Sequence, residues 1–136
     1  MSGTFGYELD LTKLTDEEKE TVKAQCDEYR KYYDLINKGE LYRLISPWKD
    51  RTRCAWSFVS EDKSEALVLV ATKTKPHNPK FLLRLKGLLP DANYRIEELC
   101  RVSSGRRLME VGANLTGVMP WKQSHESLLL HLKRVD

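Results

Sequence analysis

The alternation of hydrophobic and polar residues between positions 41 and 72 predicts three short β-strands. The first two strands show the period-two pattern that is typical of a half-buried strand. Residues 66–71 are hydrophobic at every position, which favours a central strand with both faces of its sheet covered. Proline at position 47 and the polar run 60–64 provide the turns between the strands. The alternating hydrophobic residues of the first two strands are Tyr42, Leu44, Trp56 and Phe58.

Shorter alternating segments follow towards the end of the chain. They predict strands at residues 81–86, 94–98, 106–110 and 127–133. In the last of these, Leu128, Leu130 and Leu132 share one face, and His131 and Lys133 share the other. Gly87, Pro90-Asp91 and Ser103-Ser104-Gly105 mark the turns. Residues 39–136 are therefore predicted to be mainly β, an antiparallel β-sandwich of about eight strands of the Greek-key type.

A different pattern precedes the strands. Residues 1–11 resemble a single strand, and a long helix is predicted from Thr15 to about Asn37. Thr15 and Glu18 form the sequence signature of a capping box, in which each side chain accepts a hydrogen bond from the other residue's backbone N–H. Gly39 is placed to end the helix in a left-handed conformation. We therefore expect one strand and one helix ahead of the sandwich.

One face of the predicted helix is hydrophobic. Its apolar residues are spaced by three or four positions, so they form a single stripe. The opposite face carries charged residues, so the stripe is expected to pack against other protein rather than to bind a cofactor. The residues of the stripe are Val22, Cys26, Tyr29, Tyr33 and Ile36.

Composition and charge exclude several classes of protein. The chain is 40% hydrophobic and 32% charged, as in soluble globular domains. Its net charge is only +3, and its pI of 8.7 is below the value of about 9 that a basic nucleic-acid-binding surface gives. No hydrophobic run approaches about 18 residues, and no charged leader precedes a hydrophobic segment. We expect no binding to nucleic acid or membrane and a cytoplasmic location.

The cysteines and histidines do not form a metal-binding pattern. Zinc sites use pairs of ligands at short spacing, and the chain contains neither C-x-x-C nor H-x-x-x-H. Free, buried thiols in a reducing compartment are the better interpretation. We therefore expect no metal and no cofactor. The residues considered are Cys26, Cys54, Cys100, His77, His125 and His131.

The three tryptophans raise the possibility of carbohydrate binding, because indole rings stack on sugar rings. Trp56 alternates in phase with Phe58 and is expected in the core. Trp48 and Trp121 each follow a proline in a loop, where they could contact sugar, although packing at a domain junction is favoured.

Segments along the whole chain resemble the C-terminal region of the family 36 glycoside hydrolases, which are α-galactosidases. No single segment is diagnostic, but all occur in register. The matching positions are Gly3–Leu11, Leu14, Glu18, Gly39–Leu44, Ser46-Pro47, Ala55-Trp56, Val59–Asp62, Glu65-Ala66, Leu83–Leu88, Asp91-Ala92, Tyr94-Arg95 and Leu128–Lys133.

The resemblance implies that residues 1–38 are the last strand and helix of a (β/α)8 barrel and residues 39–136 the domain that follows. Family members use two aspartates on earlier barrel strands, and neither motif is present here. Ser103-Ser104-Gly105 superficially matches the acid/base motif but falls in a predicted turn. Glu8 and Asp10 lie beside the presumed barrel strand, where a role as a helix-leading cap or in a solvated turn is favoured over one at an active-site mouth. No catalytic residue is assigned.

The expected function is that of a non-catalytic C-terminal fragment of a retaining α-galactosidase acting on sugars such as melibiose and raffinose. Its role would be structural or in oligomerisation, and its partner would be the missing barrel. Without the barrel, the helix stripe is expected to mediate self-association between copies. The alternative is a stand-alone carbohydrate-binding β-sandwich module.

Overall fold

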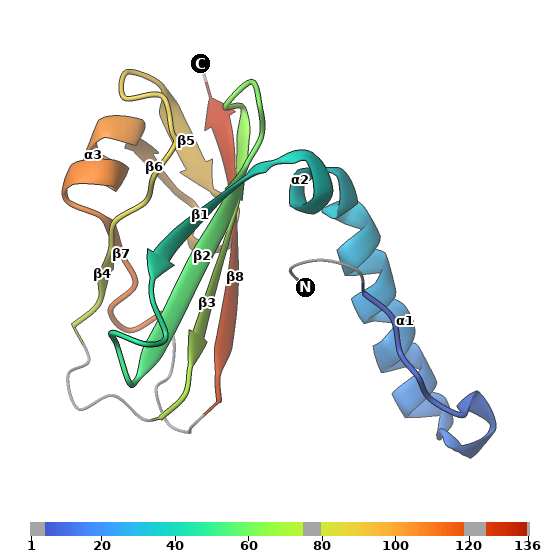
Figure 1. The fold of residues 1–136 in the computed structure, drawn as a ribbon. Coiled ribbons are helices and arrows are strands. Elements are labelled where there is room, and N and C mark those ends of the chain that lie inside the picture. Colours follow the sequence, from blue (N-terminus) through green and yellow to red (C-terminus); the bar gives the residue numbers. More distant parts are fainter. Residues whose placement is uncertain (1–4, 75–79, 119–124, 136) are drawn as a thin grey trace.

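The three strands predicted between residues 41 and 72 form one side of a large antiparallel sheet (Figure 1). The computed structural model describes residues 5–74, 80–118 and 125–135. The strands are β1 (Glu40–Ile45), β2 (Arg53–Val59), β3 (Glu65–Thr72), β4 (Leu82–Leu83), β5 (Asn93–Ile96), β6 (Arg101–Ser104), β7 (Ala113–Asn114) and β8 (Ser127–Val135). The helices are α1 (Asp16–Lys31), α2 (Tyr33–Lys38), α3 (Gly105–Glu110) and the 3-10 turns η1 (Leu11–Lys13) and η2 (Glu97–Leu99).

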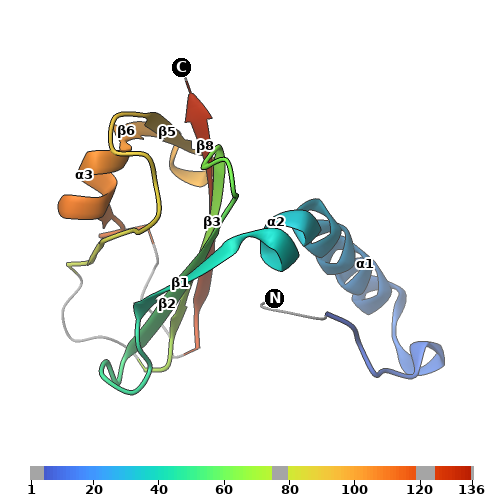
Figure 2. The ribbon, with the colours of Figure 1, turned by 45° about the horizontal axis from the view of Figure 1, so that its top comes forward.

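The described strands form two sheets of unequal size. Six strands form a sheet in the order β1-β2-β3-β8-β5-β6, and β4 and β7 pair separately. The fold is thus mainly β and antiparallel, as predicted. The connections differ from the predicted Greek key, because β8 lies beside β3, whereas a Greek key would return the fourth strand to the first. The small sheet and α3 form the second layer of the sandwich (Figures 1 and 2).

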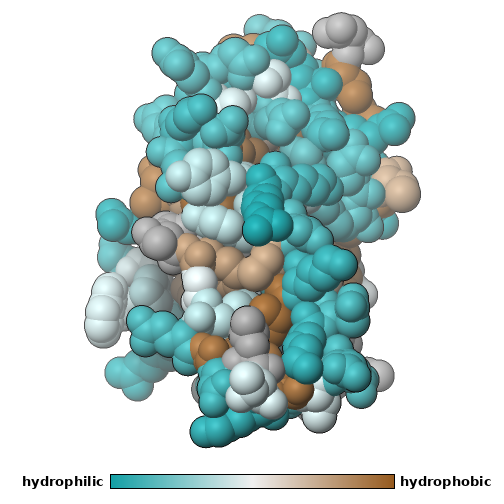
Figure 3. Space-filling model, turned by 90° about the vertical axis from the view of Figure 1, so that its right-hand side faces the viewer, coloured by the Kyte–Doolittle hydropathy of each residue, from teal (hydrophilic) through white to brown (hydrophobic). Residues whose placement is uncertain are grey.

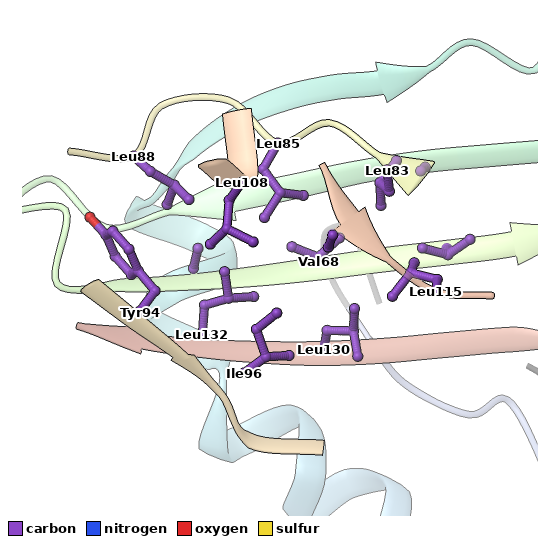
Figure 4. Packing of buried hydrophobic residues seen from close by; sticks show 14 of the residues in the cluster. Val68, Leu83, Leu85, Leu88, Tyr94, Ile96, Leu108, Leu115, Leu130 and Leu132 are labelled. Carbon is purple, nitrogen blue, oxygen red and sulfur yellow. The ribbon is translucent and has the colours of Figure 1, made fainter. Parts of the chain in front are cut away.

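The main core lies between the large sheet and this second layer (Figure 4). Alternate residues of β3 and β8 point into it, including Val68, Leu130 and Leu132. Tyr94 is fully buried there, and its hydroxyl donates to the Lys63 carbonyl at 2.8 Å and accepts from the Leu89 N–H at 3.1 Å. The predicted division of the last strand into a leucine face and a His131 face is confirmed.

Residues 106–110 form part of a helix, so the strand predicted there is wrong. Ser104 ends β6 and caps α3, because its side chain accepts from the Arg107 N–H at 3.3 Å. Only Gly105 and Leu108 of this helix are buried. Residues 106–110 therefore contain one buried side chain, which is compatible both with the periodicity of a helix and with that of a strand. The predicted turn at residues 103–105 is likewise the end of a strand followed by the start of a helix.

The capping box that begins α1 is confirmed. The Thr15 hydroxyl accepts from the Glu18 N–H at 3.3 Å, and the Glu18 carboxylate accepts from the Thr15 N–H at 2.8 Å. The predicted single helix is interrupted at Tyr32, which separates α1 from α2. Gly39 is extended rather than left-handed, with φ −71°. A glycine is required there because a Cβ would lie against the Leu35 carbonyl oxygen and 3.0 Å from that of Val59.

The strand predicted at residues 1–11 is absent from residues 5–10, which have no regular secondary structure. This segment lies along α1 instead. Phe5 contacts Tyr29 with a ring separation of 5.1 Å, and the Tyr7 hydroxyl donates to the Gln25 side chain. A strand requires a partner for its hydrogen bonds, and none of the described strands pairs with this segment.

The turn between β2 and β3 depends on one carboxylate. Asp62 accepts from the Ser64 hydroxyl at 2.7 Å and N–H at 3.0 Å and from the Ser60 hydroxyl at 2.7 Å. These hydrogen bonds, the one from the Ser64 hydroxyl above all, lower the pKa of Asp62 from 3.8 to about 2. They satisfy the carboxylate while Lys63 takes a left-handed conformation with φ 57°.

We expect a carbon-detected NMR titration to give Asp62 a pKa of about 2. Because the folded-state value lies below the ordinary one, this carboxylate stabilises the fold above about pH 4 and loses that contribution as the pH falls towards 2. Replacing Ser64 with alanine should raise the pKa, whereas Ser127→Ala, at an exposed serine elsewhere in the chain, should leave it unchanged. A value near 3.8 in the unsubstituted chain would contradict the assignment.

Candidate functional site

The outer face of the large sheet, opposite the main core, carries a row of side chains covered by α2. Phe58 of β2 stands opposite Leu67 of β3, which stands opposite His131 of β8. We call Phe58, Leu67 and His131 the covered row. Their exposed fractions are at most 5%. The second hydrophobic cluster is built on this row and includes Tyr29, Tyr32, Leu35 and Ile36 from the helices.

The helix stripe therefore has a partner within the chain, which the sequence did not predict. Tyr29 and Ile36 are buried on the covered row, and Val22 and Cys26 are partly buried. Tyr33 is 52% exposed, so its assignment to the buried stripe is wrong. The break at Tyr32 changes which side chains face the sheet and buries Tyr32 and Leu35 instead. The sandwich itself thus covers the C-terminal half of the stripe.

His131 brings a titratable group into this covered row. It is 4% exposed, and its Nε2 lies 3.2 Å from a Glu65 carboxylate oxygen. The Tyr32 ring packs edge-on against the imidazole at 5.1 Å between ring centres. The His131 backbone N–H donates to the Glu98 carboxylate at 2.8 Å. These contacts attach the start of α2 to the centre of the sheet.

A second row on the same face extends beyond α2. Trp56 of β2 stands opposite Leu69 of β3, which stands opposite Leu129 of β8. We call Trp56, Leu69 and Leu129 the open row, and all three are only partly buried. Helix α1 diverges from the sheet with distance from α2 (Figures 1 and 2). The open row packs against the edge of the second hydrophobic cluster. Hydrophobic side chains are visible in the middle and lower part of this side of the molecule (Figure 3).

The open row borders a hollow at the β1 edge of the sheet. Its volume is about 310 Å³, and its lining is hydrophobic except for Arg43. The lining residues are Leu41, Arg43, Ile45, Pro47, Cys54, Ala55 and Trp56. Leu41 is 47% exposed at this edge, so the hydrophobic surface reaches solvent there.

Trp48 follows Pro47 in the loop between β1 and β2 and is 92% exposed. It is the most exposed of the described large hydrophobic side chains. Trp56, predicted to be in the core, packs against the second cluster but is not fully buried. Trp121 lies outside the described residues. Trp48 is thus exposed to solvent in the part of the chain that the structure describes.

Of the two carboxylates considered for catalysis, Asp10 caps a helical turn and Glu8 is exposed. Asp10 caps η1 by accepting from the Thr12 N–H at 3.0 Å and hydroxyl at 2.6 Å, and these bonds lower the pKa of Asp10. The predicted capping role of Asp10 is confirmed. Glu8 is exposed on the segment before it. A lowered pKa keeps Asp10 ionised, which is the wrong direction for a general acid at neutral pH.

Other polar candidates are also accounted for. Arg106 lies on α3 and pairs with Asp91 at 2.7 Å. Cys26, Cys54 and Cys100 are free thiols, but the predicted burial is wrong, because Cys26 and Cys54 are only partly buried and Cys100 is exposed. Across residues 5–74, 80–118 and 125–135, no group of His, Cys, Asp or Glu side chains is suited to hold a metal ion. His77 lies outside this range.

Among the helices that the structure describes, none has the length and hydrophobicity needed to cross a membrane.

Comparison with known protein families confirms the resemblance to glycoside hydrolases that is seen in the sequence. The model of the glycosyl hydrolase family 36 C-terminal domain matches residues 53–132. The chain therefore belongs to this family of C-terminal domains.

Its relatives are α-galactosidases. The chain is 44% identical to α-galactosidase AgaA of Geobacillus stearothermophilus over 138 residues, which cover 100% of this chain and 18% of AgaA. It is 41% identical to the bifunctional α-galactosidase/sucrose kinase AgaSK of Mediterraneibacter gnavus, covering 93% of this chain and 13% of AgaSK. The chain thus spans less than a fifth of the length of these relatives.

Solved structures extend the likeness to the helices. The GH36 α-galactosidase AgaB from Geobacillus stearothermophilus matches with a TM-score of 0.86 and 42% identity, over 98% of this chain and 18% of AgaB. The α-galactosidase from Lactobacillus brevis matches with a TM-score of 0.89 and 28% identity, over 99% of this chain and 19% of that one. The fold described above is thus shared with the C-terminal regions of these enzymes.

Proposed function

We propose that the chain is the non-catalytic C-terminal part of a retaining α-galactosidase, which it completes structurally. The proposal rests on how unequally the matches cover the two proteins that are compared. Nearly all of this chain matches α-galactosidases, yet it spans 18% of AgaA. The catalytic apparatus belongs to the remaining length of such an enzyme. The substrates would be terminal α-galactosides, such as the raffinose and stachyose named with the AgaA structures.

Within this proposal, residues 1–38 complete the barrel and residues 39–136 form the domain that follows it. The absence of a strand at residues 5–10 is compatible with this division, because a barrel strand forms only beside its neighbouring strands. The chemistry also favours a non-catalytic role. A retaining glycosidase needs two carboxyl groups about 5 Å apart across the sugar, whereas the only carboxylates of the presumed barrel strand are Glu8 and the capping Asp10.

The test uses the isolated chain and a chimera. In the chimera, this chain replaces the matching region of Geobacillus AgaA. We expect the isolated chain to leave a chromogenic α-galactoside unhydrolysed and the chimera to hydrolyse it. AgaA lacking the region should lose activity, because a large hydrophobic surface would be exposed in it.

Two results would contradict the proposal. One is turnover by the isolated chain that survives purification and is abolished by Asp10→Asn or Glu8→Gln. The other is an AgaA lacking the region that keeps full activity and stability, since the domain would then complete nothing. The alternative of a stand-alone carbohydrate-binding module is supported by the exposure of Trp48 but not by the hydrophobic hollow beside it, since sugar sites need converging polar groups.

A further inference from the structure

Another hollow lies at the β6 end of the large sheet, on the side of the main core. It is lined by residues of β5, β6, α3 and β7, which lie near one another in the fold (Figures 1 and 2). Its volume is about 190 Å³. Sites for drug-sized ligands start at about 300 Å³, so this hollow suits a small molecule. Three of its lining residues are buried members of the main core, namely Ile96, Leu108 and Ala113.

The fold brings four polar residues from three elements to this hollow. In the register of β5 and β6, Arg101 stands opposite Ile96, a buried residue of the main core. Paired residues share one face of a sheet, so Arg101 lies on the inner face. Ser103 is two positions further along β6 and lies on the same face. We call the site the arginine hollow, and its polar residues are Arg101, Ser103, Arg107 of α3 and Asn114 of β7.

The two arginines bring positive charge that the surrounding residues do not neutralise. Among the described residues, neither the Arg101 nor the Arg107 guanidinium forms an ion pair or a hydrogen bond. Arg106, next to Arg107 on the same helix, is instead paired with Asp91 at 2.7 Å. The described residues that line the hollow include no Asp or Glu. A hollow lined by charges of one sign concentrates ions of the opposite sign, so this one favours an anion.

The charge and the hydrogen-bonding groups of the arginine hollow favour a phosphate monoester. Each guanidinium can bind two oxygens of a phosphate or a carboxylate. A phosphate monoester carries a charge of about −1.5 to −2 at neutral pH, which matches two arginines better than the single charge of a carboxylate. The Asn114 Oδ1 accepts from the Thr116 N–H at 3.0 Å, so its amide nitrogen stays available. That nitrogen and the Ser103 hydroxyl can bind hydroxyl groups.

We propose that the arginine hollow binds a small phosphate monoester of a hydroxylated molecule, such as a sugar phosphate. Arg101 and Arg107 hold the phosphate group, and Ser103 and Asn114 contact the hydroxylated part. The buried hydrophobic residues of the lining contact its C–H groups. This inference goes beyond the proposed function and does not depend on it, because the described lining comes from this chain alone. All tests use the whole 136-residue chain.

The first test is an NMR titration at a constant ionic strength of about 0.15 M, which screens distant charges. Inorganic phosphate should shift the Nε–Hε signals of Arg101 and Arg107 and the Ser103 amide in a saturable way. Glucose 6-phosphate should bind at least about tenfold more tightly than inorganic phosphate, because its hydroxyl groups add hydrogen bonds. Uncharged glucose should leave these signals unchanged. Saturable binding by glucose, equal affinities for the two phosphates, or no saturable shift of these signals would overturn the inference.

The second test removes one positive charge at a time. Arg101→Gln and Arg107→Gln should each weaken the binding of glucose 6-phosphate at least about tenfold, because hydrogen bonds between charged groups are the strong ones. Arg95→Gln is the matched control. Arg95 precedes the buried Ile96 on β5 and therefore lies on the opposite face of the same sheet. It should change the affinity by less than about twofold. Equal weakening by all three substitutions would show a general effect of charge and overturn the inference.

The third test varies the pH and needs no substitution. Phosphate monoesters change from dianion to monoanion below a pKa of about 6, whereas sulfate remains a dianion. The described residues that line the hollow include no Asp, Glu or His, so the ligand alone titrates there. We expect the affinity for inorganic phosphate to fall several-fold between about pH 7.5 and about pH 5, and that for sulfate to change by less than about twofold. A phosphate affinity independent of pH, or a parallel fall for sulfate, would overturn the inference.

Discussion

Replacing Leu132 with alanine is expected to lower the free energy of unfolding of this chain by about 3–5 kcal/mol. Leu132 is fully buried in the main core and lies at the centre of the large sheet, opposite Ala66 of β3 and Ile96 of β5. Truncation removes buried hydrophobic surface and leaves a cavity that three strands cannot close without breaking their pairing. Urea unfolding followed by circular dichroism measures the difference.

Leu82→Ala is the matched control. Leu82 is also a leucine in a strand, but it is 57% exposed, so we expect its loss to change stability by less than about 0.5 kcal/mol. A similar loss for both variants would contradict the assignment of the main core to the inner face of the large sheet. The comparison therefore tests the burial pattern rather than the general cost of removing a leucine.

Replacing Gly105 with alanine is expected to cost about 3 kcal/mol or more, although alanine is the better helix former. Helix propensity favours alanine by about 1 kcal/mol. Packing opposes it, because a Cβ at this position would overlap the Leu89 carbonyl oxygen and lie 2.9 Å from its carbon. The Gly105 N–H also donates to the Ala92 carbonyl at 2.8 Å, so the backbone cannot shift freely. We expect the free-energy cost of this steric overlap with the backbone to exceed the gain in helix propensity.

Gly6→Ala is the control for this substitution, since a Cβ at Gly6 would meet nothing within 4 Å. We expect thermal unfolding to show a large decrease in melting temperature for Gly105→Ala and none for Gly6→Ala. A stable Gly105→Ala variant would mean that α3 can move away from the segment at Leu89, and the second layer of the sandwich would then be less fixed than described.

The sequence predicted the features that depend on neighbouring residues or on a repeated pattern. The capping box of Thr15 and Glu18 needs only a local turn, and it is present. The alternation in β1 and the leucine face of β8 also report on burial. The alternation in β2 does not, because that strand is buried on both faces and Ser57 is only 1% exposed. The unbroken hydrophobic run in β3 correctly indicated a strand at the centre of a sheet. The pattern of hydrophobic residues at positions 106–110 is too short to distinguish a helix from a strand, so the prediction of a strand there is wrong.

Part of the candidate site could be predicted in the same way. The hydrophobic outer face of β3 was visible in the sequence, and so was the helix stripe that partly covers it. That these two surfaces cover each other was not visible, because they lie far apart in the sequence and their contact depends on the direction of the chain after Gly39. The exposure of Trp48 likewise has no local signal, since a tryptophan after a proline can be buried or free.

Local chemistry and periodicity thus determined the longer strands and the start of the helix, and the likeness to family 36 came from matching segments along the chain. Tertiary structure alone decided that β8 lies between β3 and β5, that the helix breaks at Tyr32, and that the helices bury one row of the outer face fully and the next row only in part. The physical reason is that strand order and helix docking depend on hydrogen bonds and packing between distant segments. A periodic pattern specifies that a face must be covered, but it does not specify by what.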